Sequence, residues 1–171
     1  MAGALKDWWN ARLRRPGEDF DQPSYALLVA SLFSSPASII PGGVAGILTP
    51  FLCWVSTGLI VFEILTILVA LIVLLRLATF VSYRRADHSR DGYQETRRWD
   101  RDYFIGATAF SAVLGYSCYA ALAQTDDPAA HITSVASTIA IASGYVSRNA
   151  GRPKFVAVQL LTFCVPMASV L

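Results

Sequence analysis

The stretch Ile64–Leu75, ILTILVALIVLL, contains no charged side chain. Extended over 59–81, it is long enough to cross a membrane as a helix, because an α-helix rises about 1.5 Å per residue and the hydrocarbon core is about 30 Å thick. No residue between Asp21 and Glu63 is charged, and none between Asp102 and Asp126. These long apolar stretches predict several transmembrane helices.

The composition of the chain agrees with this interpretation. Of its 171 residues, 54% are hydrophobic and 15% are charged, whereas about 25% of the residues of a soluble domain are charged. We therefore expect an all-α polytopic membrane protein in contact with the lipid bilayer. Residues 1–24 are polar and do not resemble a cleavable signal peptide. We expect them to form a cytoplasmic tail or interfacial segment, followed by a membrane domain at 25–171.

Proline and glycine residues divide the membrane domain. Ser35-Pro36 and Pro41-Gly42-Gly43 interrupt its first part, so 25–34 is predicted as an interfacial segment and Thr57-Gly58 as a turn. The arginine-rich segment 82–102 is predicted as a helical extension and turn at the lipid headgroups. The five predicted spans are 37–56, 59–81, 103–122, 132–146 and 155–171.

The cations of the loops predict the orientation. The N-terminal tail has four Lys and Arg residues, the loop 82–102 has six and the loop 147–154 has three, whereas the loops 57–58 and 124–131 have none. With five alternating spans, all the cation-rich loops lie on one side, which the positive-inside rule makes cytoplasmic. The sequence predicts a multi-pass protein of the bacterial inner membrane with a cytoplasmic N-terminus.

Small residues predict which helices pack together. Ala107, Ser111 and Gly115 repeat every four residues on the third span, and Ala136, Ala140 and Gly144 do so on the fourth. Such stripes let helix backbones approach closely in lipid. We expect the two stripes to face each other.

Two charged residues lie within a predicted span. Glu63 is near the outer end of the second span, where it is either locally hydrogen-bonded close to water or a ligand or proton site. Arg76 is nearer the cytoplasmic half and is expected to extend its guanidinium toward the headgroups.

The outer loop carries further candidates. Asp126, Asp127 and His131 would lie on the same side as Glu63, where they suit either a divalent metal or a solvated helix start. Their spacing matches no known metal-ligand motif, and the helix start is the preferred interpretation.

Motifs for catalysis or cofactor binding are absent from the sequence. It has no phosphate-binding loop, no G-x-S-x-G motif and no basic aromatic surface for nucleic acid. Haem held between two histidines is disfavoured because His88 and His131 fall on opposite sides. Cys53, Cys118 and Cys164 lie in separate apolar stretches and are predicted to be small buried residues. We expect no enzymatic activity, metal or cofactor for this chain.

Three stretches resemble a known family. Ser147-Arg-Asn-Ala-Gly-Arg-Pro153 is similar to the A-R-N-A-G-R-P-like turn of the N-terminal membrane sensor region of bacterial GGDEF diguanylate cyclases, some of which also carry EAL domains. Arg97-Arg-Trp-Asp-Arg-Asp-Tyr103 looks like their R-R-W-E-x-x-Y entry, and Leu32-Phe-Ser-Ser35 is a weaker match. The turn residues that carry the resemblance are Arg148, Asn149, Gly151, Arg152 and Pro153.

The resemblance implies a sensory or anchoring module for cyclic-di-GMP signalling, with a dimeric cytoplasmic output domain and an unidentified ligand. The chain contains no GGDEF or EAL segment and stops before a sixth span. We therefore expect a truncated product or a fragment of a longer receptor. The alternatives are a small transporter subunit that uses Glu63 and a structural membrane protein.

Overall fold

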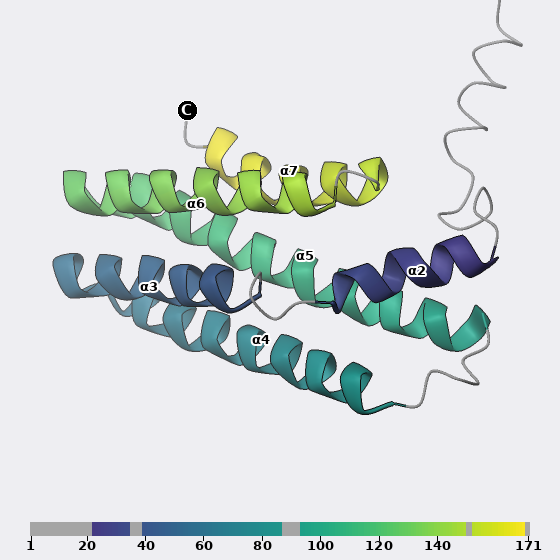
Figure 1. The fold of residues 1–171 in the computed structure, drawn as a ribbon. Helices are drawn as coiled ribbons and strands as arrows, with labels where there is room; N and C mark the ends of the chain where they lie inside the picture. Colours follow the sequence, from purple (N-terminus) through teal and green to yellow (C-terminus); the bar gives the residue numbers. More distant parts are fainter. Residues whose placement is uncertain (1–21, 35–38, 87–92, 150–151, 170–171) are drawn as a thin grey trace, which may run out of the picture.

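The computed structural model describes residues 22–34, 39–86, 93–149 and 152–169. These residues form six α-helices and no strand (Figure 1), which confirms the predicted all-α fold. The helices are α2 (Gln22–Leu32), α3 (Ile39–Thr57), α4 (Ile60–Arg85), α5 (Tyr93–Gln124), α6 (Pro128–Arg148) and α7 (Pro153–Ala168).

Four of these helices, α3 to α6, are long and apolar enough to cross a membrane. They match the first four predicted spans, although α5 begins at Tyr93 rather than at 103 and α6 at Pro128 rather than at 132. The start of α5 is thus the helical extension predicted within the arginine-rich segment. The fifth predicted span corresponds to α7, whose 16 residues reach about 24 Å, less than the thickness of the hydrocarbon core.

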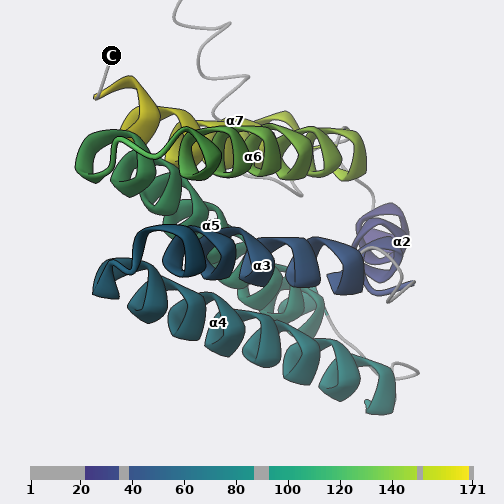
Figure 2. The same ribbon diagram turned by 90° about the vertical axis from the view of Figure 1, so that its left-hand side faces the viewer.

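Helix α5 is the central element of the bundle. In Figure 2 it lies between the pair formed by α3 and α4 and the pair formed by α6 and α7. Its side chains Tyr103, Ala107, Phe110 and Leu114 follow helical spacing and are all buried. This buried face packs within the bundle, and α3 also packs directly against α6.

The outer surface of the bundle is apolar. On α4, Ile60, Ile64, Leu71 and Leu75 are each more than half exposed. A soluble monomer rarely exposes such a continuous apolar face, whereas lipid contact requires one. The predicted bilayer contact is supported by this surface.

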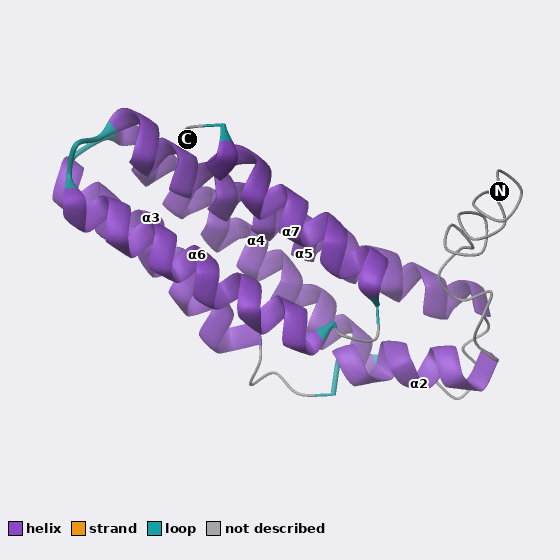
Figure 3. Ribbon diagram, turned by 90° about the horizontal axis from the view of Figure 1, so that it is seen from above, coloured by secondary structure: helices purple, strands orange, loops and turns teal. Residues whose placement is uncertain are grey.

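The ends of the bundle differ in charge. The turn between α3 and α4 contains Gly58, whose φ of 69° is a conformation that favours glycine, so the predicted turn at Thr57-Gly58 is confirmed. This turn and the one between α5 and α6 contain no lysine or arginine. The opposite end, where α2 lies beside the turn between α6 and α7 (Figure 3), is here named the cationic end. Its described cations are Arg84, Arg85, Arg97, Arg98, Arg101, Arg148, Arg152 and Lys154.

The predicted pairing of the two small-residue stripes is wrong. Ala107, Ser111 and Gly115 are buried on α5, but a Cβ atom on Gly115 would lie 2.5 Å from the Thr162 carbonyl oxygen of α7. The stripe of α6 is exposed, and a Cβ atom on Gly144 would meet no atom within 4 Å. The close helix contact is therefore between α5 and α7.

Candidate functional site

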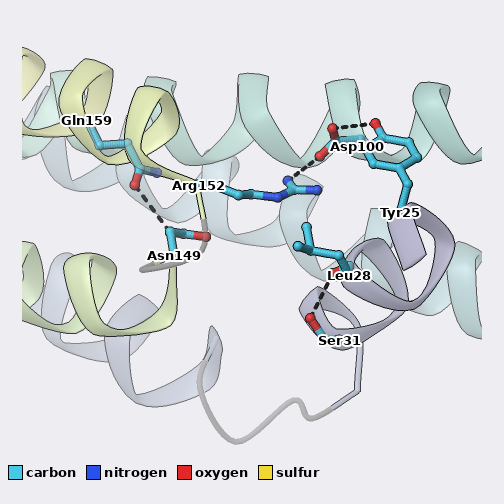
Figure 4. A network of polar contacts seen from close by, with 7 residues as sticks. All are labelled: Tyr25, Leu28, Ser31, Asp100, Asn149, Arg152 and Gln159. Carbon is cyan, nitrogen blue, oxygen red and sulfur yellow. Dashed lines mark hydrogen bonds and ion pairs between the residues drawn. The ribbon is translucent and has the colours of Figure 1, made fainter. Parts of the chain in front are cut away.

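A group of polar and aromatic residues connects four helices at the cationic end. Arg152 Nη1 donates a hydrogen bond to Asp100 Oδ1 of α5, and the Tyr25 hydroxyl of α2 donates to Asp100 Oδ2 at 2.7 Å (Figure 4). Arg148, the last residue of α6, donates from Nη2 to the Leu32 carbonyl oxygen of α2. With Tyr103, these residues are named the Asp100 cluster.

The Asp100 cluster brings together residues from three stretches that are far apart in the sequence, namely 32–35, 97–103 and 147–153. Leu32 comes from 32–35, Asp100 and Tyr103 come from 97–103, and Arg148 and Arg152 come from 147–153. The Arg148 guanidinium carbon lies 5.8 Å from the centroid of the Tyr103 ring, within cation–π range. Stretches that are far apart in the sequence thus form one contact region.

The turn between α6 and α7 holds the two arginines in place. The Asn149 backbone N–H and side-chain Nδ2 both donate to the Tyr145 carbonyl oxygen, at 3.0 and 3.1 Å, and close the end of α6. Nδ2 also lies 3.3 Å from Gln159 Oε1 on α7. Pro153 is the first residue of α7, a position where its missing N–H costs no helical hydrogen bond. Arg148 and Asn149 thus end α6 and Pro153 begins α7 on either side of the predicted turn, and Gly151 lies outside the described residues.

The ion pair of the cluster is largely shielded from solvent. The side chains of Arg152 and Asp100 are 12% and 17% exposed. In contrast, Arg98 pairs with Asp102 at 4.0 Å, and the Arg98 side chain is 74% exposed. Because removing one partner of a shielded pair leaves an uncompensated charge, Asp100 contributes more to the structure than Asp102 does.

Aromatic rings pack beside the cluster. Phe33 stacks on Tyr83 with a centroid distance of 4.1 Å and contacts Tyr103 and Trp99 edge-on at 5.9 and 6.5 Å. These rings come from α4, α5 and the residue after α2. They hold the end of α2 against α4 and α5.

Arg76 does not adopt the predicted orientation toward the headgroups. Its Nη1 donates to the Tyr145 hydroxyl of α6 at 2.6 Å, and its guanidinium carbon lies 5.4 Å from the Phe110 ring centroid. The stem of the side chain runs across Gly106, where a Cβ atom would lie 3.0 Å from Arg76 Cγ. Arg76 therefore crosses the bundle interior and connects α4, α5 and α6.

The candidate metal ligands on the outer side, Glu63, Asp126, Asp127 and His131, do not come together as a metal site. No group of three His, Cys, Asp or Glu side chains within the described ranges could hold a metal ion. Glu63 is exposed in the first turn of α4, and Asp126 is exposed in the turn before α6. His131 Nε2 lies 2.8 Å from the Thr125 carbonyl oxygen. Cys53 and Cys118 are buried as predicted, whereas Cys164 is exposed on α7 because it lies on the outward face of that helix.

Asp127 is the N-cap of α6, as the helix-start interpretation predicted. Its Oδ1 accepts a hydrogen bond from the Ala129 N–H at 3.0 Å, and Pro128 follows it. The Ser56 hydroxyl and then the Ala129 N–H lower the pKa of the Asp127 carboxyl by hydrogen bonding to its charged form.

The N-cap at Asp127 is expected to make the stability of the start of α6 depend on pH. A carboxyl with a lowered folded-state pKa stabilises the fold above its unfolded pKa, and this stabilisation disappears as the pH falls through the folded value. We expect Asp127→Asn to abolish this acid dependence at the start of α6 while keeping a capping oxygen. Hydrogen exchange of the amides of 129–132, measured across the acidic range, tests it. An unchanged pH dependence in Asp127→Asn would contradict it.

Comparison with protein-family models, curated proteins and solved structures found no match to this chain. The Asp100 cluster is therefore interpreted from its own geometry. The sequence indicated Arg148, Asn149 and Arg152 but not Asp100, which accepts a hydrogen bond from Arg152, or Tyr25, which donates one to Asp100. Helical spacing could have indicated Asp100, since Asp100, Tyr103 and Ala107 lie on the face of α5 that continues into the buried core.

Proposed function

We propose that this chain is the membrane-embedded sensory or anchoring module of a cyclic-di-GMP signalling protein of the diguanylate cyclase type. The observation that supports this proposal best is the meeting of the three family-like stretches in the Asp100 cluster. Residues that had only a sequence resemblance in common turn out to contact one another. In this proposal the chain performs no catalysis itself, and an output domain does so.

The geometry suggests how such a module would act. Arg152 directly precedes α7, and its ion pair fixes that point to α5. Arg148 fixes the end of α6 to α2. A ligand that changes the packing of the spans would therefore shift the start of α7 relative to α5, and we propose that a homodimer passes this shift to the output domains.

We further propose that the chain resides in the bacterial inner membrane with its cationic end in the cytoplasm. In a variant without the three native cysteines, a single cysteine at Asp126 should react with an impermeant maleimide on intact spheroplasts. A cysteine at Arg98, which is also exposed, should react only after permeabilisation. Labelling of both positions from the same side would contradict this topology.

The signalling role is tested in the organism. We expect the reading frame beyond the codon for Leu171 to encode a further span and then a GGDEF or EAL domain. Expression of that product should change cellular cyclic-di-GMP, and Arg152→Gln should alter the response without removing the protein from the membrane. A continuation that lacks both domains would refute the proposal.

A further inference from the structure

A cavity of about 240 Å³ lies between α4 and α5 near the cationic end. Its lining includes the apolar side chains Leu75 and Ile105, which are 68% and 57% exposed on the outer surface of the bundle. The cavity is therefore bordered by the apolar surface that faces lipid.

The same cavity is lined by polar groups. Tyr103 is 5% exposed, and its hydroxyl is buried with no hydrogen-bond partner among the described residues. Leaving a buried hydroxyl without a partner is unfavourable, so it calls for an explanation such as a bound molecule. Arg76 also lines the cavity, and its guanidinium carbon lies 5.7 Å from the Tyr103 ring centroid.

The charge of this region favours an anion. A guanidinium has five N–H donors, and the Tyr145 hydroxyl accepts a hydrogen bond from one of its nitrogens. Asp102 also lines the cavity, but Arg101 and Arg98 lie 3.6 and 4.0 Å from its carboxylate oxygens and compensate its charge. An arginine inside a membrane span is costly unless it meets a partner of opposite charge or a polar group.

We propose that this cavity binds the phosphate of a membrane lipid headgroup. Arg76 and the Tyr103 hydroxyl donate hydrogen bonds to the phosphate oxygens, and the acyl chains lie along Leu75 and Ile105. A lipid fits better than a free phosphate ion because the cavity borders the exposed apolar surface. On α5 the lining of the cavity extends from Asp102 to Ala109. Asp102 lies next to the start of the predicted third span, where that span is expected to meet the headgroups.

The proposal is tested by photolabelling of the full chain in micelles of a maltoside detergent, which contains no phosphate. The probe is a phosphatidylglycerol that carries a photoreactive group next to its phosphate. We expect labelling to concentrate in the peptide that contains 102–109 and to be competed by unlabelled phosphatidylglycerol. Inorganic phosphate should not compete. Equal competition by inorganic phosphate, or labelling spread evenly over the spans, would overturn the proposal.

Two variants identify the cavity as the site of labelling. Ala109→Leu fills the cavity and should reduce labelling at least fivefold, whereas Ala112→Leu, at an exposed position of the same helix outside the lining, should not. Tyr103→Phe removes only the hydroxyl and should weaken binding about tenfold, as expected for a hydrogen bond to a charged group. It should not lower the unfolding temperature in lipid-free detergent. If Tyr103→Phe and Ala109→Leu are both labelled like the unaltered chain, the proposal is wrong.

Discussion

Asparagine in place of Asp100 is expected to lower the free energy of unfolding by about 3 kcal/mol. Asp100 accepts hydrogen bonds from both Arg152 and Tyr25, and the ion-pair side chains are 12% and 17% exposed. Breaking a buried pair by removing one partner costs about 3–5 kcal/mol, because the other charge stays buried without compensation. The remaining exposure places the expected loss at the lower end of this range.

The measurement is reversible unfolding of the purified chain in mixed micelles of a mild detergent and dodecyl sulfate. Arg98→Gln provides the matched control, because it breaks an ion pair at the same end whose arginine is 74% exposed, and it should cost less than about 1 kcal/mol. Adding Arg152→Gln to Asp100→Asn should restore part of the lost stability, since it removes the charge that Asp100→Asn leaves buried without compensation. Equal losses for Asp100→Asn and Arg98→Gln would show that the Asp100 cluster does not hold the bundle together.

The positions of the long apolar helices could be predicted because contact with lipid imposes a strong constraint on sequence. Every backbone polar group in the hydrocarbon must be satisfied within its own helix, so each span needs a continuous apolar stretch. The start of α4 after Gly58 and the cap at Asp127 follow from local chemistry in the same way. These features depend on neighbours in the sequence.

The partners within the bundle could not be predicted from the same information. Asp100 and Asp102 are both acids among arginines, and only the packing of α2 and α7 against α5 buries the first and leaves the second paired near solvent. Arg76 was expected to extend toward the headgroups, but Gly106 leaves room for it to cross the interior to Tyr145. The burial of Asp100 and the orientation of Arg76 depend on tertiary contacts, which the spacing of residues along one helix does not specify.

Gly115→Ala is expected to disrupt the contact between α5 and α7. The added Cβ atom would lie 2.5 Å from the Thr162 carbonyl oxygen and 3.1 Å from the Phe163 Cα atom. Both atoms belong to the backbone of α7, which cannot rotate away as a side chain would. We expect the free energy of unfolding to fall by about 2–3 kcal/mol, as for other overpacked sites.

Gly144→Ala is the matched control for this variant, because a Cβ atom on Gly144 meets nothing within 4 Å. This change should leave the stability unaltered or raise it by up to about 1 kcal/mol, since alanine favours a helix more than glycine does. The same unfolding assay compares the two variants. If Gly144→Ala destabilised the chain as much as Gly115→Ala, the stripe on α6 would have to be packed against another helix. A loss of stability in Gly115→Ala without a loss in Gly144→Ala is expected only if α5 packs against α7 at Gly115 and the small residues of α6 face outward.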